Sequence, residues 1–287
     1  MNFSFYVKII LRGVGQIMLQ ENAITGLFFL AGLFYVSIYM GIAALLATII
    51  GTVTAYILKY NKEEIEKGLY GFNAALIGVA VLVFCKPTII SFVVIIIGSI
   101  ISTFIFHFFL QRKIPVFTFP FVVITWLIVL IFHAFFIQHL NEKIALPNTP
   151  SINYLSLAFK GFGQVIFQEN MVASILFFVA VFISSPISAL YGLVASFIAG
   201  VVAFSFSFSI QEINMGLLGY NAVLCAIVFA GKKLHNYLWA FVSILLALLI
   251  STLMFTYNIT QLTFPFVAST CIILFFKQTI QPKIAKI

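Results

Sequence analysis

Long runs without a single Asp, Glu, Lys or Arg dominate this 287-residue chain. A membrane-spanning helix needs about 20 consecutive, mostly apolar residues, and three of the runs are long enough for two such helices joined by a tight turn. The long runs are 22–58, 171–210 and 238–276, and shorter ones occupy 68–85, 87–106, 114–132 and 213–231. With 63% hydrophobic and 8% charged residues, the chain has too few polar side chains to cover a water-soluble fold. We therefore expect an integral membrane protein with about ten transmembrane spans.

The spans are expected to be helices, which gives an all-α fold. A membrane β-barrel would need a polar, lumen-facing residue at every second position, and residues 92–97 show no such alternation. A helical bundle is the remaining way to satisfy every backbone amide in lipid. Residues 1–12 lack a separate hydrophobic core with a cleavage site, so no removable signal peptide is expected. Cys85, Cys225 and Cys271 have no paired spacing, which indicates small apolar residues rather than disulfides or metal ligands.

The basic residues predict how the chain is oriented. The formal net charge is +8, but the Lys and Arg residues are scattered among the loops and form no single patch for nucleic acid. With a cytoplasmic N-terminus and five spans in each half, twelve of them fall inside and three outside. The inside residues are Lys8, Arg12, Lys59, Lys62, Lys67, Arg112, Lys113, Lys232, Lys233, Lys277, Lys283 and Lys286, and the outside residues are Lys86, Lys143 and Lys160. This bias predicts a multi-pass protein of the cell (inner or plasma) membrane with both termini cytoplasmic.

An internal repeat identifies the polar residues that occur twice. At a shift of 148, residues 13–35 and 161–183 share eight of 23 positions, including every Gln, Glu and Asn. At the same shift GLYGFNAAL (68–76) falls on GLLGYNAVL (216–224), and at a shift of 145 TFPFV (118–122) recurs at 263–267. Three ordered matches at nearly one spacing indicate a tandem duplication.

The duplication divides the chain into 1–148 and 149–287, each with five spans. Because five is odd, the second half is expected to be inserted upside down relative to the first, as an inverted repeat. Transporters of this type place their site near the midplane between the halves, often on broken helices. Residues 13–22 and 161–170 are too short and polar to span, and they predict two re-entrant half-helices.

A second broken element is predicted at Thr118-Phe119-Pro120 and at its repeat, Thr263-Phe264-Pro265. Threonine is a favoured helix N-cap and proline is tolerated in the first helical turn, so a helix is expected to begin at each threonine. Irregular backbone at this depth is tolerated only where it is buried in protein or lines a wet cavity.

These paired segments, G-x-G-Q, L-x-G-[FY]-N and T-F-P-F, resemble the repeated signatures of the urea transporter family, in its bacterial form. The match runs in order over nearly the whole chain and includes three motifs that each occur twice. The resemblance implies a homotrimer in the lipid bilayer with a separate pore through each protomer. It also implies a narrow filter with an outer and an inner urea site on either side of a tighter middle.

The resemblance assigns site residues position by position. The paired pore glutamines fall on Gln16 and Gln164. Aromatic slot positions fall on Leu19 and Phe72 for one site and on Phe167 and Tyr220 for the other, the apolar constriction on Ile17, Val165, Leu76 and Leu224, and its centre on Thr118 and Thr263. Thr125 and Thr270 are also paired and remain competitors for the centre. The chain departs from the family at Leu19, which supplies no ring, and at Asn22-Ala23 and Asn170-Met171, where the family commonly has Asn-Pro.

The chemistry of urea agrees with this assignment. Urea is planar and uncharged, and burying its carbonyl and amide groups without partners would cost on the order of several kcal/mol. Terminal carbonyls of a half-helix and the oxygens of Gln16 and Gln164 could accept from urea, while glutamine amides or threonine hydroxyls could donate to it. Asn73 and Asn221 are either structural or part of the path. Glu21 and Glu169 either serve transport or brace loop amides.

Two classes of function remain open. The first is passive, channel-like transport of urea, and the alternative is a proton-coupled transporter of urea or a related small amide that uses Glu21 or Glu169. An ammonium channel would carry a repeated histidine pair, but His107 and His133 align at a shift of 148 with Phe255 and Gln281. The sequence contains no metal cluster, nucleophile with a base, or phosphate-binding glycine loop, so we expect neither an enzyme nor a cofactor.

Overall fold

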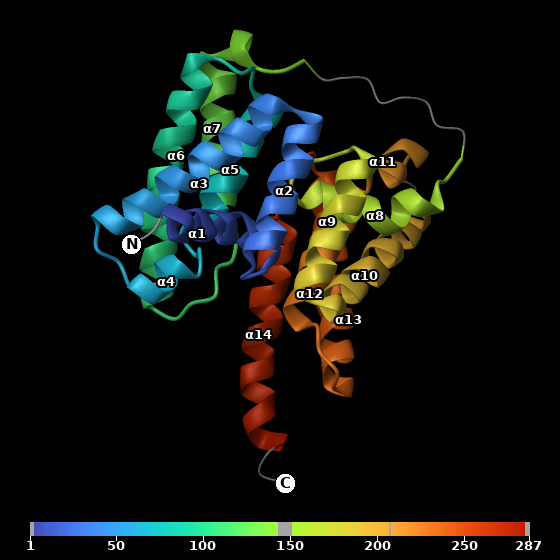
Figure 1. The fold of residues 1–287 in the computed structure, drawn as a ribbon. Helices are drawn as coiled ribbons and strands as arrows, with labels where there is room; N and C mark the ends of the chain where they lie inside the picture. Colours follow the sequence, from blue (N-terminus) through green and yellow to red (C-terminus); the bar gives the residue numbers. More distant parts are fainter. Residues whose placement is uncertain (1–2, 143–150, 207, 285–287) are drawn as a thin grey trace.

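The computed structural model describes residues 3–142, 151–206 and 208–284, and nearly all of them are helical (Figure 1). The first half contains α1 (Phe3–Gly15), the 3-10 turn η1 (Gln16–Met18), α2 (Ala23–Val36), α3 (Ile38–Ile57), α4 (Lys62–Glu66), α5 (Phe72–Phe84), α6 (Ile89–Gln111), α7 (Phe119–Phe135) and η2 (Ile137–His139). The second half contains α8 (Tyr154–Val165), α9 (Met171–Ser184), α10 (Pro186–Ser205), α11 (Ile210–Met215), α12 (Gly219–Phe229), α13 (Leu234–Thr256) and α14 (Phe264–Ile284). The predicted boundary at 148/149, the external Lys143 and the internal Lys286 lie outside the described ranges.

The helices confirm an all-α membrane protein. By length and composition, five segments could each cross a membrane: α3, α6, α10, α13 and the stretch Ile210–Phe229. A sixth is added if α1 with η1 and α2, which meet at a bend of 77°, are counted as one span. Four shorter apolar helices cover Phe72–Phe84, Phe119–Phe135, Met171–Ser184 and Phe264–Thr279. The count of ten spans stays a prediction.

The distribution of side chains on α6 is typical of a helix whose solvent is lipid. The large apolar residues Ile97 and Phe104 are exposed, whereas Ser99 and Thr103 are buried against neighbouring helices. Their hydroxyls donate to the carbonyls of Ile95 at 2.7 Å and of Ser99 at 3.0 Å, so no buried polar group is left unpaired here. Small and hydroxyl-bearing residues allow close helix packing where lipid offers no hydrophobic driving force.

The repeated asparagine of the two Q-E-N segments starts a helix in each half. Asn22 Oδ1 accepts from the amides of Ile24 and Thr25 at 2.8 and 3.4 Å, which caps α2. Asn170 Oδ1 accepts from the first-turn amides of α9 at 2.8 and 3.2 Å in the same way. These caps satisfy amides that have no partner within the helix. The caps of α2 and α9 are therefore supplied by the asparagines that follow Glu21 and Glu169.

The two halves pack against each other along α2 and α9 (Figure 1). The rings of Phe29 and Phe177 meet edge to face with centroids 5.2 Å apart. Thr25 Oγ1 donates to the carbonyl of Ala180 at 2.8 Å across the same boundary. A further contact joins Trp126 Nε1 in α7 to a carbonyl of the second half at 2.8 Å.

The half-helices begin earlier than the sequence predicted. Residues 13–22 and 161–170 do not form helices of their own; each range includes the C-terminal end of a helix, α1 or α8, and the connection to the next helix. The apolar residues before each motif are helical, and the glycine and glutamine residues mark where the helix ends. The prediction of a break was correct, but its helical part was placed too late, at residue 13 where α1 begins at Phe3 and at residue 161 where α8 begins at Tyr154.

Candidate functional site

The C-terminal end of α1 is closed by two backbone hydrogen bonds. Leu19 N donates to Gln16 O at 2.9 Å, and Gln20 N donates to Gly15 O at 3.2 Å. Leu19 itself has a left-handed backbone with φ 61°. Together these features form a Schellman motif, which satisfies carbonyls at the helix end.

The C-terminal end of α8 has the same geometry. Phe167 N donates to Gln164 O at 3.1 Å, Gln168 N donates to Gly163 O at 2.9 Å, and Phe167 has φ 58°. The repeated sequence thus builds the same irregular backbone twice.

The left-handed positions at these two breaks are occupied by large side chains. Glycine is the usual residue there, and this chain uses it at Gly68 (φ 78°) and Gly216 (φ 74°). For other residues the left-handed region costs roughly 1–2 kcal/mol. Such strain persists where the surrounding structure holds it, and it clusters at functional sites. The strained backbone at Leu19 and Phe167 therefore falls at two positions that the sequence assigned to the site.

The two predicted pore glutamines are both buried but have different partners. Gln16 is 8% exposed, and its Nε2 donates to the carbonyl of Lys67 at 3.0 Å. Gln164 is 7% exposed, and its buried Nε2 has no hydrogen-bond partner among the residues that the structure describes. A buried amide without a partner costs about 1–3 kcal/mol, so a native example calls for an explanation.

The neighbouring glutamines Gln20 and Gln168 serve the backbone. Their Nε2 atoms donate to the carbonyls of Met18 and Ile166, each at 2.8 Å. Both side-chain amides thereby satisfy carbonyls at the break of a helix, while the buried Oε1 of Gln168 has no partner among the described residues.

The two threonines of the T-F-P-F segments contact each other. Thr118 Oγ1 and Thr263 Oγ1 lie 2.6 Å apart, and both residues are 2% exposed. Thr118 stands at the N-cap position of α7, but its side chain does not cap the helix, contrary to the prediction. Its hydroxyl faces Thr263 instead. Of the competing pair, Thr270 Oγ1 lies 3.6 Å from Cys225 Sγ, and the hydroxyl of Thr125 has no partner among the described residues.

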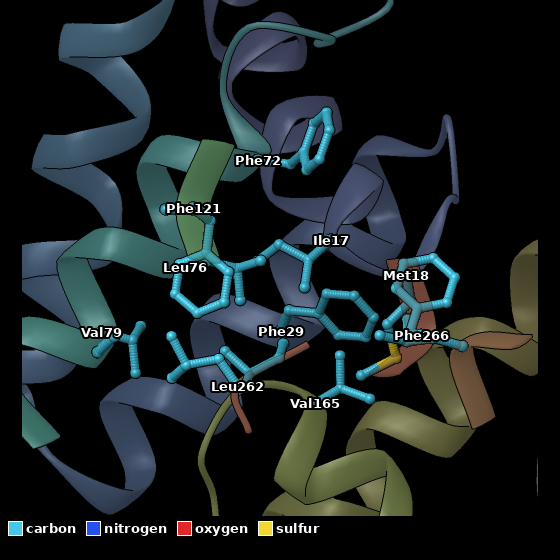
Figure 2. Close-up of a cluster of buried hydrophobic side chains, with 14 of the residues drawn as sticks. Ile17, Met18, Phe29, Phe72, Leu76, Val79, Phe121, Val165, Leu262 and Phe266 are labelled. Carbon is cyan, nitrogen blue, oxygen red and sulfur yellow. The ribbon is translucent and has the colours of Figure 1, made fainter. Parts of the chain in front are cut away.

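The four predicted constriction residues belong to one buried apolar cluster. Ile17, Val165, Leu76 and Leu224 are each at most 1% exposed. Figure 2 shows the first three among rings of both halves, with Phe29, Phe121 and Phe266 nearby. The structure therefore brings side chains of the two breaks and of α5 into one interior.

The predicted aromatic slots are assembled differently. The ring of Phe72 meets Phe106 edge to face, with centroids 5.2 Å apart. Phe167 meets two rings of the first half, Phe121 at 6.1 Å and Phe84 at 6.4 Å. Neither ring was predicted from the sequence, although Phe121 belongs to the repeated T-F-P-F segment.

The remaining predicted residues lie at the edge of this interior. Leu19 is half-buried, and Tyr220 donates its hydroxyl to the carbonyl of Leu262 at 2.7 Å. Glu21 and Glu169 are exposed. Lys160 Nζ donates to the backbone carbonyl of Glu169. Neither carboxylate is part of the buried cluster.

Comparison with known proteins identifies the family. A family model described as "Urea transporter" matches residues 7–278. Urea transporter 1 of Rattus norvegicus is 26% identical over 240 residues, which cover 77% of this chain and 62% of the rat protein. Urea transporter 1 of Ovis aries is 26% identical over 242 residues, which cover 79% of this chain and 63% of the sheep protein. The chain thus spans less than two thirds of the length of these relatives. Because the family model covers nearly all of its residues, the chain belongs to the urea transporter family.

Proposed function

We propose that this chain conducts urea passively across the cell membrane, through a narrow pore between its two halves. Family membership supports the substrate. The observation that carries the location is the buried Nε2 of Gln164, which has no partner among the described residues and lies beside the strained end of α8. An amide donor in an apolar interior suits the carbonyl oxygen of urea, which needs a partner once its water is removed.

The path would run past the repeated polar groups in order. Gln16 and Gln164 each serve one urea site, flanked by Leu19 with Phe72 and by Phe167 with Tyr220. Ile17, Val165, Leu76 and Leu224 form the apolar constriction, with the paired hydroxyls of Thr118 and Thr263 at its centre. Flat apolar walls admit a flat, uncharged solute and reject a hydrated ion. No catalytic group is needed for this function.

We also propose that residues 1–148 and 149–287 are related by a two-fold axis in the membrane plane, as inverted repeats. The support comes from residues that the repeat makes equivalent and that touch each other. Phe29 meets Phe177 at the shift of 148, and Thr118 meets Thr263 at the shift of 145. Self-contact between equivalent positions is the property of a two-fold axis. Inverted-repeat transporters have their site near such an axis, so both contacts would lie close to the proposed site.

Transport is expected to be passive. Urea flux into proteoliposomes should rise linearly with the gradient until the site saturates, and a proton ionophore should not abolish it. Glu21→Gln and Glu169→Gln should keep the flux within about twofold of the parent, because both carboxylates lie outside the buried cluster. Accumulation of urea against its gradient, driven by a pH difference and lost in either variant, would favour the proton-coupled alternative.

The topology is expected to place both termini in the cytoplasm. The helix α4 and the C-terminal end of α7 lie at opposite ends of the first half (Figure 1). With Cys271 replaced by serine, Glu142→Cys should react with a membrane-impermeant maleimide added to intact cells, and Glu63→Cys should react only after permeabilisation. Both positions are exposed. The reverse labelling pattern would invert the proposed orientation.

The proposed assembly is a homotrimer with one pore in each protomer. It rests on the family resemblance alone, and the mass of the purified protein in detergent, corrected for bound detergent, measures it directly. A mass of one or two chains at the concentration of the transport assay would contradict it.

A further inference from the structure

A buried asparagine of α5 holds the start of α7. Asn73 Oδ1 accepts from Phe121 N at 3.1 Å, and Asn73 Nδ2 donates to Phe117 O at 3.2 Å. Asn73 is 3% exposed, and Phe117 has a left-handed backbone with φ 45°. One side chain therefore satisfies a first-turn amide of α7 and the carbonyl of the strained residue before Thr118.

The second half contains the same arrangement on α12. Asn221 Oδ1 accepts from Phe266 N at 3.1 Å, and Asn221 Nδ2 donates to Leu262 O at 3.3 Å. Asn221 is fully buried, and Leu262 has φ 44°. Here the same carbonyl also accepts from the hydroxyl of Tyr220 at 2.7 Å. The first half has Phe72 at that position, which carries no hydroxyl.

The asparagine does what the threonine would do at an ordinary helix start. An N-cap threonine normally has an extended backbone and accepts from the third amide of its own helix. Thr118 instead has φ −91° and ψ 15°, in the sparsely populated bridge region, and makes no such bond. The third amide of α7, that of Phe121, is satisfied by Asn73, and the hydroxyl of Thr118 is left to face Thr263.

We propose that Asn73 and Asn221 are positioning residues that cap α7 and α14 from neighbouring helices and so keep the hydroxyls of Thr118 and Thr263 in the path, a role that rests on the proposed urea pore. The strained backbone at Phe117 and Thr118 persists only while its polar groups have partners. Without Asn73, the amide of Phe121 would be unpaired in the membrane interior. The chain would then relax toward an ordinary N-cap, with the hydroxyl of Thr118 turned away from the pore.

The test is a double-mutant cycle read by selectivity. The parent chain, Asn73→Leu, Thr118→Val and the double variant are each reconstituted into proteoliposomes, and the permeability ratio of urea to thiourea is measured. The sulfur of thiourea is a poor acceptor, so a hydroxyl that donates to the solute favours urea. Thr118→Val should lower the ratio about two- to tenfold, the effect of one hydrogen bond. Asn73→Leu should lower the ratio by the same factor, and the double variant should lower it no further, because both changes take the hydroxyl of Thr118 out of the path.

Asn73→Asp is the conservative control. In its neutral form, which an apolar interior favours, the Asp carboxyl can both accept from Phe121 N and donate to Phe117 O, so it should keep the ratio within about twofold of the parent. If Asp lowers the ratio as much as Leu does, the capping oxygen is not what positions Thr118. Additive effects in the cycle, or an unchanged ratio in a folded Asn73→Leu protein, would likewise overturn the inference. If Thr118→Val itself leaves the ratio unchanged, the failure lies in the proposed pore centre.

If Asn73→Leu does not fold, the equivalent substitution in the second half, Asn221→Leu, provides the test. In Asn221→Leu the carbonyl of Leu262 still has the hydroxyl of Tyr220 as a donor, so this variant should be the more stable of the two. Its cycle with Thr263→Val should show the same non-additive loss of selectivity. A thermal midpoint for Asn221→Leu below that of Asn73→Leu would contradict the assigned contacts.

Discussion

Gly26→Ala is expected to abolish folded protein. A Cβ atom on Gly26 would lie 1.8 Å from the carbonyl oxygen of Leu11, 2.6 Å from the carbonyl carbon of the same residue and 3.1 Å from the amide nitrogen of Gly15. All three atoms belong to the backbone of α1, so no side-chain rotation relieves the clash. Overpacking a core typically costs about 1–3 kcal/mol, and separating two helix backbones should exceed that range.

The clash would also damage the site. To make room, α2 would have to move away from α1, and the connection between them contains the Asn22 cap and the Schellman motif at Leu19. Gln16 stands at the end of the same helix. This substitution is therefore expected to disrupt the fold and the proposed urea path together.

Gly98→Ala is the matched control for Gly26→Ala. It adds the same methyl group to a buried glycine of a transmembrane helix, but the nearest atoms are methyl groups of Ile124 and Ile77 at 3.2 Å, which can shift slightly. Size-exclusion profiles and thermal midpoints in detergent compare the two variants. Gly98→Ala should give a monodisperse protein and Gly26→Ala should aggregate or be degraded. A monodisperse Gly26→Ala protein with the midpoint of the parent would mean that α1 and α2 are farther apart than the structure has them.

Gln164→Leu is expected to remove most urea transport while leaving the fold intact. In the proposed pore the Nε2 of Gln164 donates to urea, and it has no other partner among the described residues. Leucine is similar in size and removes an unpaired buried amide, so thermal stability should be unchanged or higher. The urea left without its partner should cost about 1–3 kcal/mol, which is a fall in permeability of about 5- to 150-fold.

Gln16→Leu provides the contrast. This substitution also removes the hydrogen bond that Gln16 Nε2 donates to the carbonyl of Lys67 at 3.0 Å. Both transport and thermal stability should therefore fall. Flux per reconstituted protein and the thermal midpoint measure the two effects separately. If folded Gln16→Leu and Gln164→Leu proteins conduct urea like the parent, the assigned pore is wrong. The next candidates for urea ligands would then be the repeated residues Gln20, Glu21, Gln168 and Glu169.

Hydropathy and repetition determined what kind of molecule this is. The long charge-free runs and the small share of charged residues require lipid as the solvent of the helices. The duplicated motifs include Gln16, Gln164, Thr118 and Thr263 among many scattered polar residues. Hydropathy and repeated motifs can be read directly from the sequence, so the all-α membrane fold and the family could be predicted without coordinates. The family resemblance carried the assignment of roles further than the residues alone allowed.

Local geometry was predicted less well. Glycine and glutamine near Gln16 marked a break, but the position of the helix relative to that break depended on hydrogen bonds such as Gln20 N to Gly15 O. The N-cap rule named Thr118 correctly as the start of α7 and failed for its hydroxyl, because a residue 145 positions away competes for it. Sequence rules for caps describe one helix and cannot include a partner from another half.

Tertiary structure alone decided which equivalent positions behave alike. The repeat pairs Gly26 with Ser174, which suggests that a side chain would be tolerated, yet only the backbone of α1 shows that none fits at Gly26. It pairs Asn73 with Asn221, and only the contacts show that both cap a helix other than their own. In lipid nearly every face of a helix is apolar, so hydropathy does not reveal which face packs. That choice depends on the close fit of backbones and on the few polar groups that must find partners across the fold.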